Sequence, residues 1–311
     1  NNLLSMSAEK YLVFGGKTGW IGIQLVEMLK AQGKDVTAAA SRIENLSAIS
    51  EELDSVKPTH LLMSAGLTGR PNVDWCEFNK EETLKVNVAG TLLIADQCNK
   101  RGIHCTIFGT GCIYEYDADH PIGGKGFLEN EPPNFDKSFY SKTKGMVQEL
   151  LTSYPHVLLL RIRMPISDDL SPRNFVTKIA RYNKVVDVPN SMSVLRELLP
   201  LSLAMALAKD TGVFNLTNPG AISHNEVLTL YKAHVDPSFE WTNFSLEEQS
   251  RVITAGRSNN TLDTTKLEAA AARLGSPLSG IKEAVEETMK NIRRRLEADG
   301  AYPAALPTKL P

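Results

Sequence analysis

A tyrosine and a lysine four residues apart are the first residues in this sequence that could carry chemistry. The segment Tyr140-Ser141-Lys142-Thr143-Lys144 is predicted to begin a helix, and its spacing places Tyr140 and Lys144 on one face. A phenol beside an ammonium group has a lowered pKa and can donate or accept a proton near neutral pH. The pattern YxxxK is common, so its meaning depends on what the rest of the chain supplies.

A glycine-rich turn supplies a second element of chemistry. The apolar run Tyr11–Phe14 leads into a GxxGxxG pattern and then into helical periodicity. Such a turn lets backbone N–H groups at a helix N-terminus bind a pyrophosphate. The alternative is a turn that only lets a helix pack on a strand, but the position after the first strand favours a dinucleotide site. We therefore expect the cofactor to contact Gly16, Lys17, Thr18, Gly19, Trp20, Ile21 and Gly22.

The end of the second predicted strand indicates which dinucleotide binds. NAD-binding proteins place an acidic side chain there for the ribose hydroxyls, whereas this chain reads Thr37-Ala38-Ala39-Ala40-Ser41-Arg42. Arg42 favours the 2′-phosphate of NADP, so NADPH is the predicted cofactor. Glu44 lies close enough to keep NADH as a weaker alternative, and Arg42 could be an ordinary surface cation.

These residues need a scaffold of strands and helices. Apolar runs alternate with helical periodicity, which predicts an α/β fold: a Rossmann-type doubly wound parallel sheet with a smaller, interleaved C-terminal substrate-binding lobe. The predicted boundaries are 9–163 for the NADP-binding domain, with strands returning near 185–217, 164–300 for the lobe and 301–311 for a loose tail. The expected strands are Tyr11–Phe14, Val36–Ala39, Leu61–Ser64, Thr106–Gly109, Val157–Arg161 and Val213–Leu216. The expected helices are Ile21–Gln32, Glu82–Lys100, Ser141–Ser153, Leu198–Lys209 and Ile281–Glu297.

Composition limits the function further. The 311 residues carry 34 basic and 36 acidic side chains and are 42% hydrophobic, as in soluble globular proteins. A net charge of -2 gives no reason to expect nucleic acid as a partner. No apolar run approaches the ~18 residues of a membrane span. The four cysteines lack metal-type spacing, and the polar residues 1–5 lack the order of a signal peptide, which favours a reducing, cytoplasmic compartment and no metal.

The glycine turn and the YxxxK together resemble an extended short-chain dehydrogenase/reductase. The catalytic Ser/Thr, Tyr and Lys of that superfamily imply Thr110 as the hydroxyl that acts with Tyr140 and Lys144, and Ala65 and Gly66 as further cofactor contacts. Sugar-nucleotide dehydratases carry an acidic pair directly after this hydroxyl. Here Gly111-Cys112 follows Thr110, which argues against dehydratase chemistry.

Further stretches narrow the resemblance. Four of them look like dTDP-4-dehydrorhamnose reductases: Lys57–His60, Ser64–Gly66, Val73–Glu77 and Arg257–Asp263. The last departs from the family's RPxNSxLD signature by one missing residue and by Ser258 in place of proline. Others look like bifunctional nucleotide-rhamnose epimerase/reductases: Thr68–Glu77, Arg163–Ser167, Pro172–Phe175, Thr177–Tyr182 and Asn190–Met192. The resemblance implies 3,5-epimerisation and NADPH-dependent 4-keto reduction of a nucleoside-diphospho-4-keto-6-deoxy-D-glucose, with UDP-L-rhamnose as the favoured product and a homodimer as the assembly.

Two residues carry the expected epimerisation. GDP-fucose synthase, a relative with the same double activity, uses a cysteine two residues after its catalytic hydroxyl, and Cys112 stands there. The epimerase/reductase likeness puts Lys178 in the partner role. The alternatives are an inert buried thiol at Cys112 and a solvated helix cation at Lys178.

Guanidinium and amide groups are the expected ligands of the substrate, because guanidinium groups make bidentate contacts with phosphate oxygens. The residues are Arg70, Asn87, Arg173, Asn174, Arg257 and Asn260, of which Asn87 also matches a superfamily asparagine that supports the fold near the active site.

Two other functions stay open. One is a 4-ketoreductase without epimerase activity, and the other is a non-catalytic NADP-binding regulatory subunit, which the complete set of Thr110, Tyr140 and Lys144 disfavours.

Overall fold

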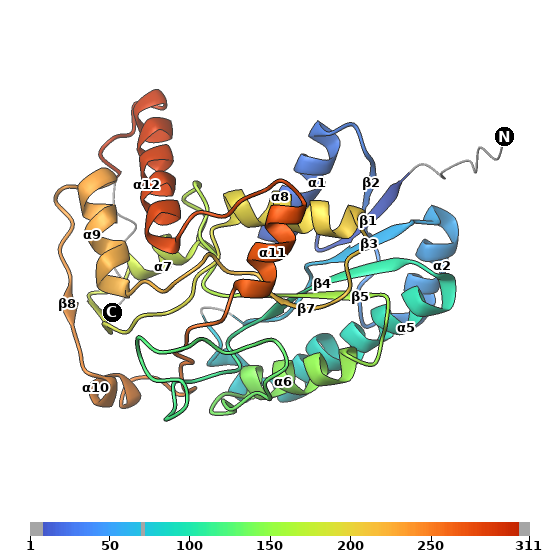
Figure 1. The fold of residues 1–311 in the computed structure, drawn as a ribbon, viewed down its shortest axis with the longest axis horizontal. Helices are drawn as coiled ribbons and strands as arrows, with labels where there is room; N and C mark the ends of the chain where they lie inside the picture. Colours follow the sequence, from blue (N-terminus) through green and yellow to red (C-terminus); the bar gives the residue numbers. More distant parts are fainter. Residues whose placement is uncertain (1–8, 70–71, 305–311) are drawn as a thin grey trace.

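A six-stranded parallel sheet forms the centre of the structure, a computed structural model that describes residues 9–69 and 72–304 (Figure 1). Its strand order is β2-β1-β3-β4-β5-β7, and every neighbouring pair is parallel, which confirms the predicted sheet. Because the order reverses at β1, the crevice for a ligand lies beyond the carboxyl ends of β1 and β3. The strands are β1 (Lys10–Phe14), β2 (Asp35–Ala38), β3 (His60–Met63), β4 (His104–Thr110), β5 (Val157–Ile162) and β7 (Gly212–Asn215).

Helices cover both faces of the sheet, because its strands are apolar on both sides (Figure 1). On one face lie α1 (Trp20–Ala31), α8 (Leu195–Leu207) and α11 (Thr265–Arg273). On the other lie α2 (Leu46–Val56), α5 (Thr91–Arg101) and α6 (Phe139–Leu151). The sequence reasoning did not single out α2.

A π-helical turn divides the helix that the sequence predicts at Glu82–Lys100. The chain forms α4 (Lys80–Leu84), then the turn η1 (Lys85–Gly90), then α5. Gly90 permits a close approach here, because a Cβ at this residue would lie 2.8 Å from the carbonyl oxygen of Ile43. The extra residue of such a turn redirects side chains, and π-turns are frequent at functional sites. Here the turn contains the buried side chain of Asn87.

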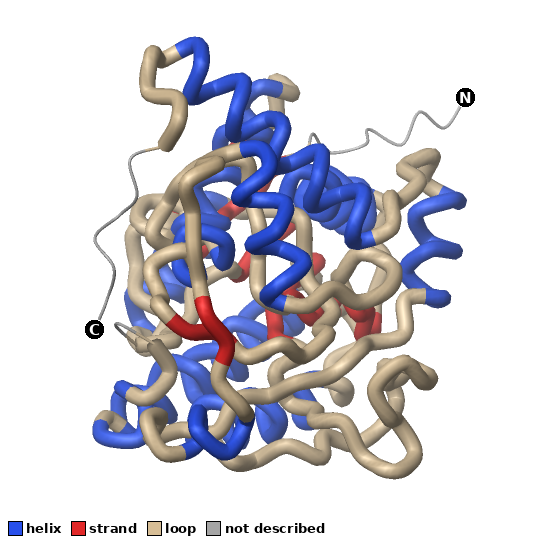
Figure 2. The backbone as a smooth tube through the Cα atoms, turned by 90° about the vertical axis from the view of Figure 1, so that its left-hand side faces the viewer, coloured by secondary structure: helices blue, strands red, loops and turns tan. Residues whose placement is uncertain are grey.

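The smaller lobe has its own apolar core, and Figure 2 shows the helices, loops and short strands of the chain by secondary structure. It contains α7 (Phe175–Ile179), α9 (His224–His234), α10 (Leu246–Ser250), α12 (Ile281–Ala298) and a two-stranded sheet of β6 (Lys184–Val185) and β8 (Thr242–Asn243). A further short helix, α3 (Trp75–Phe78), lies between β3 and α4 in the chain.

Two segments differ from the predicted domain limits, which otherwise stay predictions. Helix α11 comes from the stretch expected to form the lobe, yet Leu267 and Ala271 pack in the core of the sheet with α1 and α8. Residues 301–304 are not loose, because Ala304 is buried in the lobe core and the Tyr302 ring lies 4.7 Å from the Arg293 guanidinium. The rest of the expected tail lies outside the described residues.

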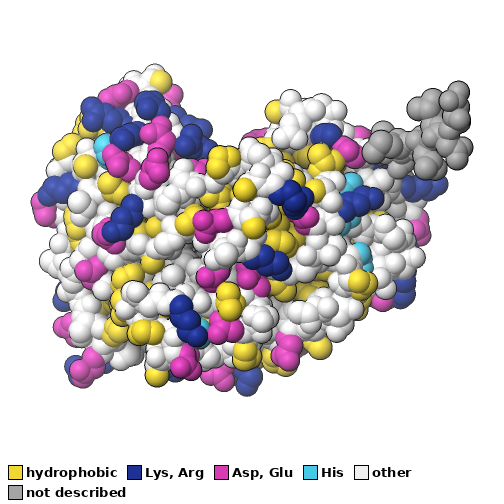
Figure 3. Space-filling view, in the orientation of Figure 1, with side chains coloured by type: hydrophobic (Ala, Val, Ile, Leu, Met, Phe, Trp, Pro, Cys, Tyr) yellow, Lys and Arg dark blue, Asp and Glu magenta, His cyan; other side chains and the backbone are white. Residues whose placement is uncertain are grey.

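The surface charge, the helices and the metal-ligating side chains indicate which kinds of partner the structure could bind. On the face shown in Figure 3, acidic and basic side chains are intermingled. No helix among the described residues is long and apolar enough to cross a bilayer. Within the same part of the chain, no group of three or more His, Cys, Asp or Glu side chains could hold a metal ion.

A stack of buried rings lies at the amino ends of three central strands. The rings of Tyr11 and His60 are 5.0 Å apart and nearly parallel, and that of His104 is 5.7 Å from His60. His60 is only 2% exposed. Burial, and to a lesser degree the neighbouring His104, lowers the pKa of His60 to about 4.

The low pKa of His60 predicts a loss of stability in mild acid. An unfolded histidine has a pKa of about 6.5, so between about pH 6.5 and about pH 4 the unfolded chain binds a proton that the folded chain does not. The free energy of unfolding should therefore fall by up to about 3 kcal/mol across this window. Urea denaturation of wild type and His60→Phe at pH 7 and pH 5 measures the effect, with His234→Gln as control. An equal loss in wild type and His60→Phe would contradict the assignment.

Candidate active site

The turn between β1 and α1 has the shape of an anion-binding loop. Gly15 adopts a φ of +86°, and its carbonyl oxygen accepts a hydrogen bond from Gly19 N at 2.8 Å. A Cβ at Gly22 would lie 2.3 Å from that oxygen, so only glycine allows the helix to start so close to the strand. No side chain caps Gly19 at the start of α1, so the first N–H groups of the helix remain available to a phosphate. Gly15 was not among the predicted cofactor residues, although its place in the motif pointed to it.

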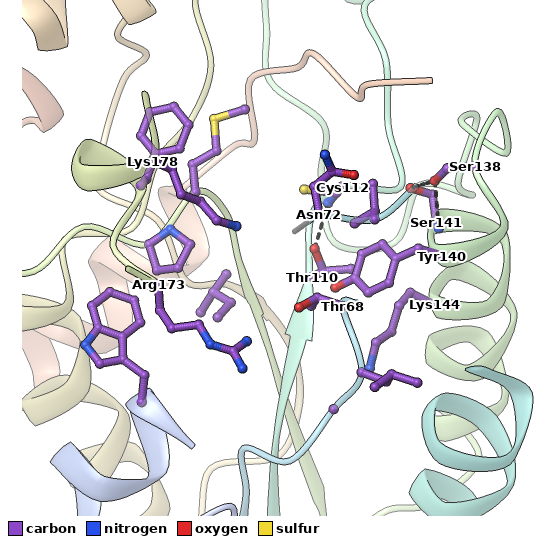
Figure 4. A pocket seen from close by; sticks show the side chains of 18 of the residues that line it. Thr68, Asn72, Thr110, Cys112, Ser138, Tyr140, Ser141, Lys144, Arg173 and Lys178 are labelled. Carbon is purple, nitrogen blue, oxygen red and sulfur yellow. Dashed lines mark hydrogen bonds between the residues drawn. The ribbon is translucent and has the colours of Figure 1, made fainter. Parts of the chain in front are cut away.

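A cavity of about 1340 Å³ opens between this turn, the carboxyl ends of the strands and the smaller lobe. It brings together residues from the first strand to the loop after α10, as Figure 4 shows in part. The predicted site residues that line it are Lys17, Thr18, Gly19, Trp20, Ile21, Arg42, Ala65, Gly66, Thr110, Cys112, Tyr140, Lys144, Arg173, Lys178 and Arg257. Gly16 and Gly22 are buried in the turn and act through its shape.

Thr110, Tyr140 and Lys144 lie along one wall of the cavity (Figure 4). Thr110 is the last residue of β4, and its hydroxyl accepts a hydrogen bond from Cys112 N at 3.1 Å. Tyr140 and Lys144 lie on the first turns of α6, as the spacing predicts. The amine of Lys144 is close to the end of β3, because a Cβ at Gly66 would lie 3.6 Å from it.

The start of α6 is held by two side chains that position Tyr140. Ser138 is the N-cap, and its hydroxyl accepts a hydrogen bond from Ser141 N at 3.0 Å. Glu77 of α3 accepts one from Phe139 N at 2.6 Å, which adds a negative charge at the positive end of the helix. Both interactions satisfy N–H groups that a helix start leaves free.

The pKa of Tyr140 differs from the sequence-based expectation. Burial raises it above the ordinary value, the neighbouring Cys112 raises it further, and a hydrogen bond with Thr110 only partly offsets these effects. Burial also lowers the pKa of Lys144 to about 8. The protein without its cofactor therefore does not show the expected lowering of the Tyr140 pKa, because desolvation of the phenol outweighs the hydrogen bond with Thr110. Tyr140 is a protonated phenol at neutral pH, the form that can donate a proton.

Cys112 and Lys178 face each other across the cavity (Figure 4). Cys112 follows β4 and is partly exposed, whereas the other three cysteines are buried. Lys178 lies on the short helix α7 of the smaller lobe. Burial lowers the pKa of Lys178, the cations Arg173 and Arg257 lower it further, and Cys112 opposes them. An amine with a lowered pKa can exchange protons near neutral pH.

Three predicted substrate ligands do not reach the cavity. Asn87 binds the backbone of Leu67 in both directions, at 2.9 and 2.8 Å. Asn174 caps α7 and donates to two carbonyl groups, and Asn260 donates to the carbonyl oxygens of Gly111 and Tyr114. All three are fully buried, so they support the loops around the cavity.

The predicted arginines differ in their surroundings. Arg173 is exposed and lines the cavity. Arg257 lines it as well, but its Nη1 lies 2.8 Å from Asp74 Oδ1, which ties the loop after α10 to the start of α3. Burial opposes ionisation of Asp74, but hydrogen bonds from Arg257 and backbone amides outweigh it and lower its pKa. Arg70 lies outside the described residues.

Other lining residues were not predicted from the sequence. Thr68 and Asn72 line the cavity from the segment before α3, and His224 lines it from the start of α9. The indole N–H of Trp20 donates to Asp169 Oδ2 at 2.9 Å, which joins the cofactor turn to the lobe. No local motif signals these contacts, because each joins segments far apart in the chain.

The fold and the site together define a class. A doubly wound sheet with a glycine turn, opening onto the same cavity as a Thr–Tyr–Lys set, is the architecture of a nicotinamide-dependent enzyme of the short-chain dehydrogenase/reductase type. A sequence model of the NAD dependent epimerase/dehydratase family matches residues 11–166, and the chain belongs to this family. Relatives with more than half of their aligned residues identical are named as epimerase/reductases, which confirms the resemblance to bifunctional nucleotide-rhamnose epimerase/reductases and makes the chain an enzyme of that kind.

Three relatives illustrate the similarity. The chain is 56% identical over 266 residues to the bifunctional dTDP-4-dehydrorhamnose 3,5-epimerase/dTDP-4-dehydrorhamnose reductase of Arabidopsis thaliana, covering 85% of this chain and 88% of that protein. It is 56% identical to the trifunctional UDP-glucose 4,6-dehydratase/UDP-4-keto-6-deoxy-D-glucose 3,5-epimerase/UDP-4-keto-L-rhamnose-reductase RHM1 of the same plant, covering 83% of this chain but spanning only 39% of that protein. The crystal structure of the L780 UDP-rhamnose synthase from Acanthamoeba polyphaga mimivirus superimposes with a TM-score of 0.86 at 39% identity, covering 91% of this chain and 99% of that one.

Proposed function

We propose that this enzyme epimerises C3 and C5 of a nucleoside-diphospho-4-keto-6-deoxy-D-glucose and then reduces its 4-keto group with NADPH, giving the L-rhamnose nucleotide with UDP as the favoured carrier. The observation that carries the proposal is the position of Cys112 and Lys178, opposite each other in the cavity that also contains Thr110, Tyr140 and Lys144. The relatives act on either dTDP- or UDP-linked sugars by their names, so kinetics with both nucleotides must distinguish the two carriers.

The residues around the glycine turn fit a dinucleotide. Glycine at residues 15 and 22 lets α1 start directly against the end of β1, and the uncapped start of α1 supplies N–H donors for a pyrophosphate. Lys144 is suited to hold the nicotinamide ribose, because its amine lies beside Gly66 at the end of β3. When bound, NADPH supplies the hydride for C4, and Tyr140 donates the proton to the oxygen.

Epimerisation requires an acid and a base on the two sides of the sugar ring. The 4-keto group acidifies the protons at C3 and C5, and removing one leaves an enolate whose charge lies on O4. Tyr140 and Thr110 are hydroxyl donors suited to stabilise that charge. Cys112 on one wall and Lys178 on the other can remove and return protons from opposite faces. The same carbonyl is then reduced, so one cavity serves both reactions.

The test supplies the enzyme with NADPH and either UDP- or dTDP-4-keto-6-deoxy-D-glucose. We expect NADPH oxidation and an L-rhamnose nucleotide, identified by NMR, with the higher kcat/KM for UDP. A 6-deoxyhexose of unchanged configuration at C3 and C5 would show a reductase without epimerase activity. Stable NADPH with both substrates would instead favour a regulatory subunit.

The proposed preference for NADPH rests on Arg42. Two neighbouring carboxylates, Glu44 and Glu52, compete with the 2′-phosphate of NADPH for the donors after β2. Arg42 is exposed and its Nε donates to Glu44 Oε1 at 2.6 Å. Glu52 accepts hydrogen bonds from Ala40 N at 2.7 Å and from Ser41 N at 2.9 Å, so the amides after β2 already face a carboxylate. A 2′-phosphate must therefore replace Glu44 as the partner of Arg42.

Arg42→Ala should lower kcat/KM for NADPH about tenfold or more and leave that for NADH nearly unchanged, because only NADPH has the phosphate that a guanidinium binds. Glu44→Gln should raise the preference for NADPH, since it frees Arg42. Steady-state kinetics with both cofactors measure the ratios, and the control is Arg251→Ala, an exposed arginine that follows α10 and pairs with Glu247. A wild-type enzyme that prefers NADH would refute the proposal.

We also place the enzyme in the cytoplasm as a homodimer. Apolar side chains are exposed on α4 and α6, at Leu84, Met146 and Leu150, where a second copy could cover them. Light scattering should give twice the chain mass of 34.2 kDa, and Met146→Glu with Leu150→Glu should shift it toward the monomer.

A further inference from the structure

A buried arginine lies next to Cys112 and has no role in the mechanism described so far. Arg163 follows β5 and is 1% exposed. Its guanidinium donates to Asn190 Oδ1 at 2.8 Å and to the carbonyl oxygens of Ser258 and Asn260 at 2.9 and 3.2 Å. These acceptors are all neutral oxygens. A buried cation that is held only by neutral groups costs free energy unless a negative charge forms nearby.

The side chain of Arg163 runs directly beneath the residue before Cys112. A Cβ at Gly111 would lie 2.9 Å from Arg163 Cγ and 3.0 Å from Cδ, so glycine is needed for the stem to pass. The Nε–H, next along that stem, is buried and has no hydrogen-bond partner among the described residues. The interaction with the Cys112 thiol opposes the effect of burial on the pKa of Arg163. Both terminal nitrogens are thus engaged by protein oxygens, and Nε is the guanidinium nitrogen left without a partner in the described part of the chain, next to the stem that passes Gly111.

We infer that Arg163 is a positioning residue for epimerisation, whose buried guanidinium stabilises the thiolate of Cys112. This inference rests on the proposed role of Cys112. The thiolate takes the proton from the substrate carbon, the electron pair of the C–H bond becomes the enolate, and the sulfur becomes a neutral thiol. Arg163 keeps its own protons throughout, and its Nε–H donates to the sulfur while that sulfur is charged.

Several other titratable groups surround Cys112 and Arg163, and among them Arg163 is the group whose positive charge does not depend on pH. Tyr140 from α6 faces Cys112 as a neutral phenol, since its pKa is raised by burial. His224 of α9 and Tyr116 face Arg163, and burial lowers the pKa of His224 to about 4, so it is neutral at pH 7. Lys178 of α7 is the second cation near Cys112, but burial and two arginines lower its pKa. A guanidinium cannot lose its proton under these conditions.

The experiment measures the alkylation of Cys112 by iodoacetamide as a function of pH in the NADPH-bound enzyme. The other three cysteines are buried, so the reagent reports on Cys112, and Cys112→Ser gives the background. Hydrogen bonds to a charged group contribute about 1.5–3 kcal/mol, so Arg163→Met should lower the alkylation rate at pH 7 about tenfold or more and move the curve about one pH unit or more to alkaline pH. Arg163→Lys keeps the charge and should restore part of the rate.

A second variant and a matched control separate this role from a packing effect. Asn190→Asp leaves Arg163 in place but sets a carboxylate against its guanidinium, and it should also move the curve to alkaline pH. Arg161→Lys changes another buried arginine, which binds Gln148, and should leave the curve unchanged. Deuterium exchange at C3 and C5 should fall in parallel with the alkylation rate.

The outcomes for this inference and for the proposed function are distinct. If folded Asn190→Asp, judged by circular dichroism, alkylates with the wild-type pH curve, Arg163 has no electrostatic role and the inference is overturned, even if Arg163→Met does not fold. If Cys112→Ala exchanges substrate protons at the wild-type rate, the proposed role of Cys112 fails. The alkylation curves still decide whether Arg163 stabilises the thiolate in that case.

Discussion

Tyr140→Phe should lower kcat for NADPH-dependent reduction by about 10²–10⁴-fold, the usual contribution of a positioned acid. The phenol lies on the cavity wall beside Thr110 and is protonated at neutral pH, so its removal takes away the group proposed to transfer a proton to the oxygen at C4. The affinity for NADPH should change little, because Lys144 and the glycine turn remain. Stopped-flow absorbance at 340 nm and fluorescence titration with NADPH measure the two quantities.

The control for this variant is Tyr154→Phe, which removes a tyrosine hydroxyl outside the cavity. It should reduce the substrate at the wild-type rate. Wild-type turnover by Tyr140→Phe would reject the assignment of the proton donor. A joint loss of turnover and of NADPH affinity would mean that Tyr140 acts mainly in holding the cofactor.

Cys112→Ala and Lys178→Met should each slow the exchange of the C3 or C5 protons with D2O by about 10²–10⁴-fold, because an acid or base is removed from one side of the ring. Thr110, Tyr140 and Lys144 are untouched, so slow reduction of the unepimerised ketone should continue and give a 6-deoxyhexose that is not rhamnose. Methionine at residue 178 keeps the apolar stem and removes only the amine. NMR of the substrate, with and without NADPH, follows the exchange directly.

Two substitutions of the same kind elsewhere serve as controls. Cys98→Ala removes a buried thiol from the core of the sheet, and Lys142→Met removes an exposed amine from α6. Both should exchange protons like wild type. Wild-type exchange in both Cys112→Ala and Lys178→Met would make the two residues structural, and epimerisation would then depend on other groups.

Local patterns were enough to predict much of the fold and those parts of the candidate site that lie within one turn or one helix. The six parallel strands follow from short apolar runs, since a strand covered on both faces is apolar throughout. The glycine turn is a local motif, as is the spacing of Tyr140 and Lys144 on one helix face. One predicted helix, Glu82–Lys100, is interrupted by η1 for a physical reason. Asn87 in this turn binds Leu67, a contact between segments that are far apart in the sequence.

The sequence by itself therefore determined the scaffold, the glycine turn and the placement of Tyr140 and Lys144 on one helix face, because each depends on residues a few positions apart. Only the tertiary structure decided which distant residues meet. It brought Lys178 opposite Cys112, directed Asn174 and Asn260 to the backbone, and buried Arg163 beneath Gly111. It also decided the direction of the Tyr140 pKa, which burial raises. Desolvation and long-range contacts depend on how the two lobes pack around the cavity. No local pattern in the sequence predicts that packing.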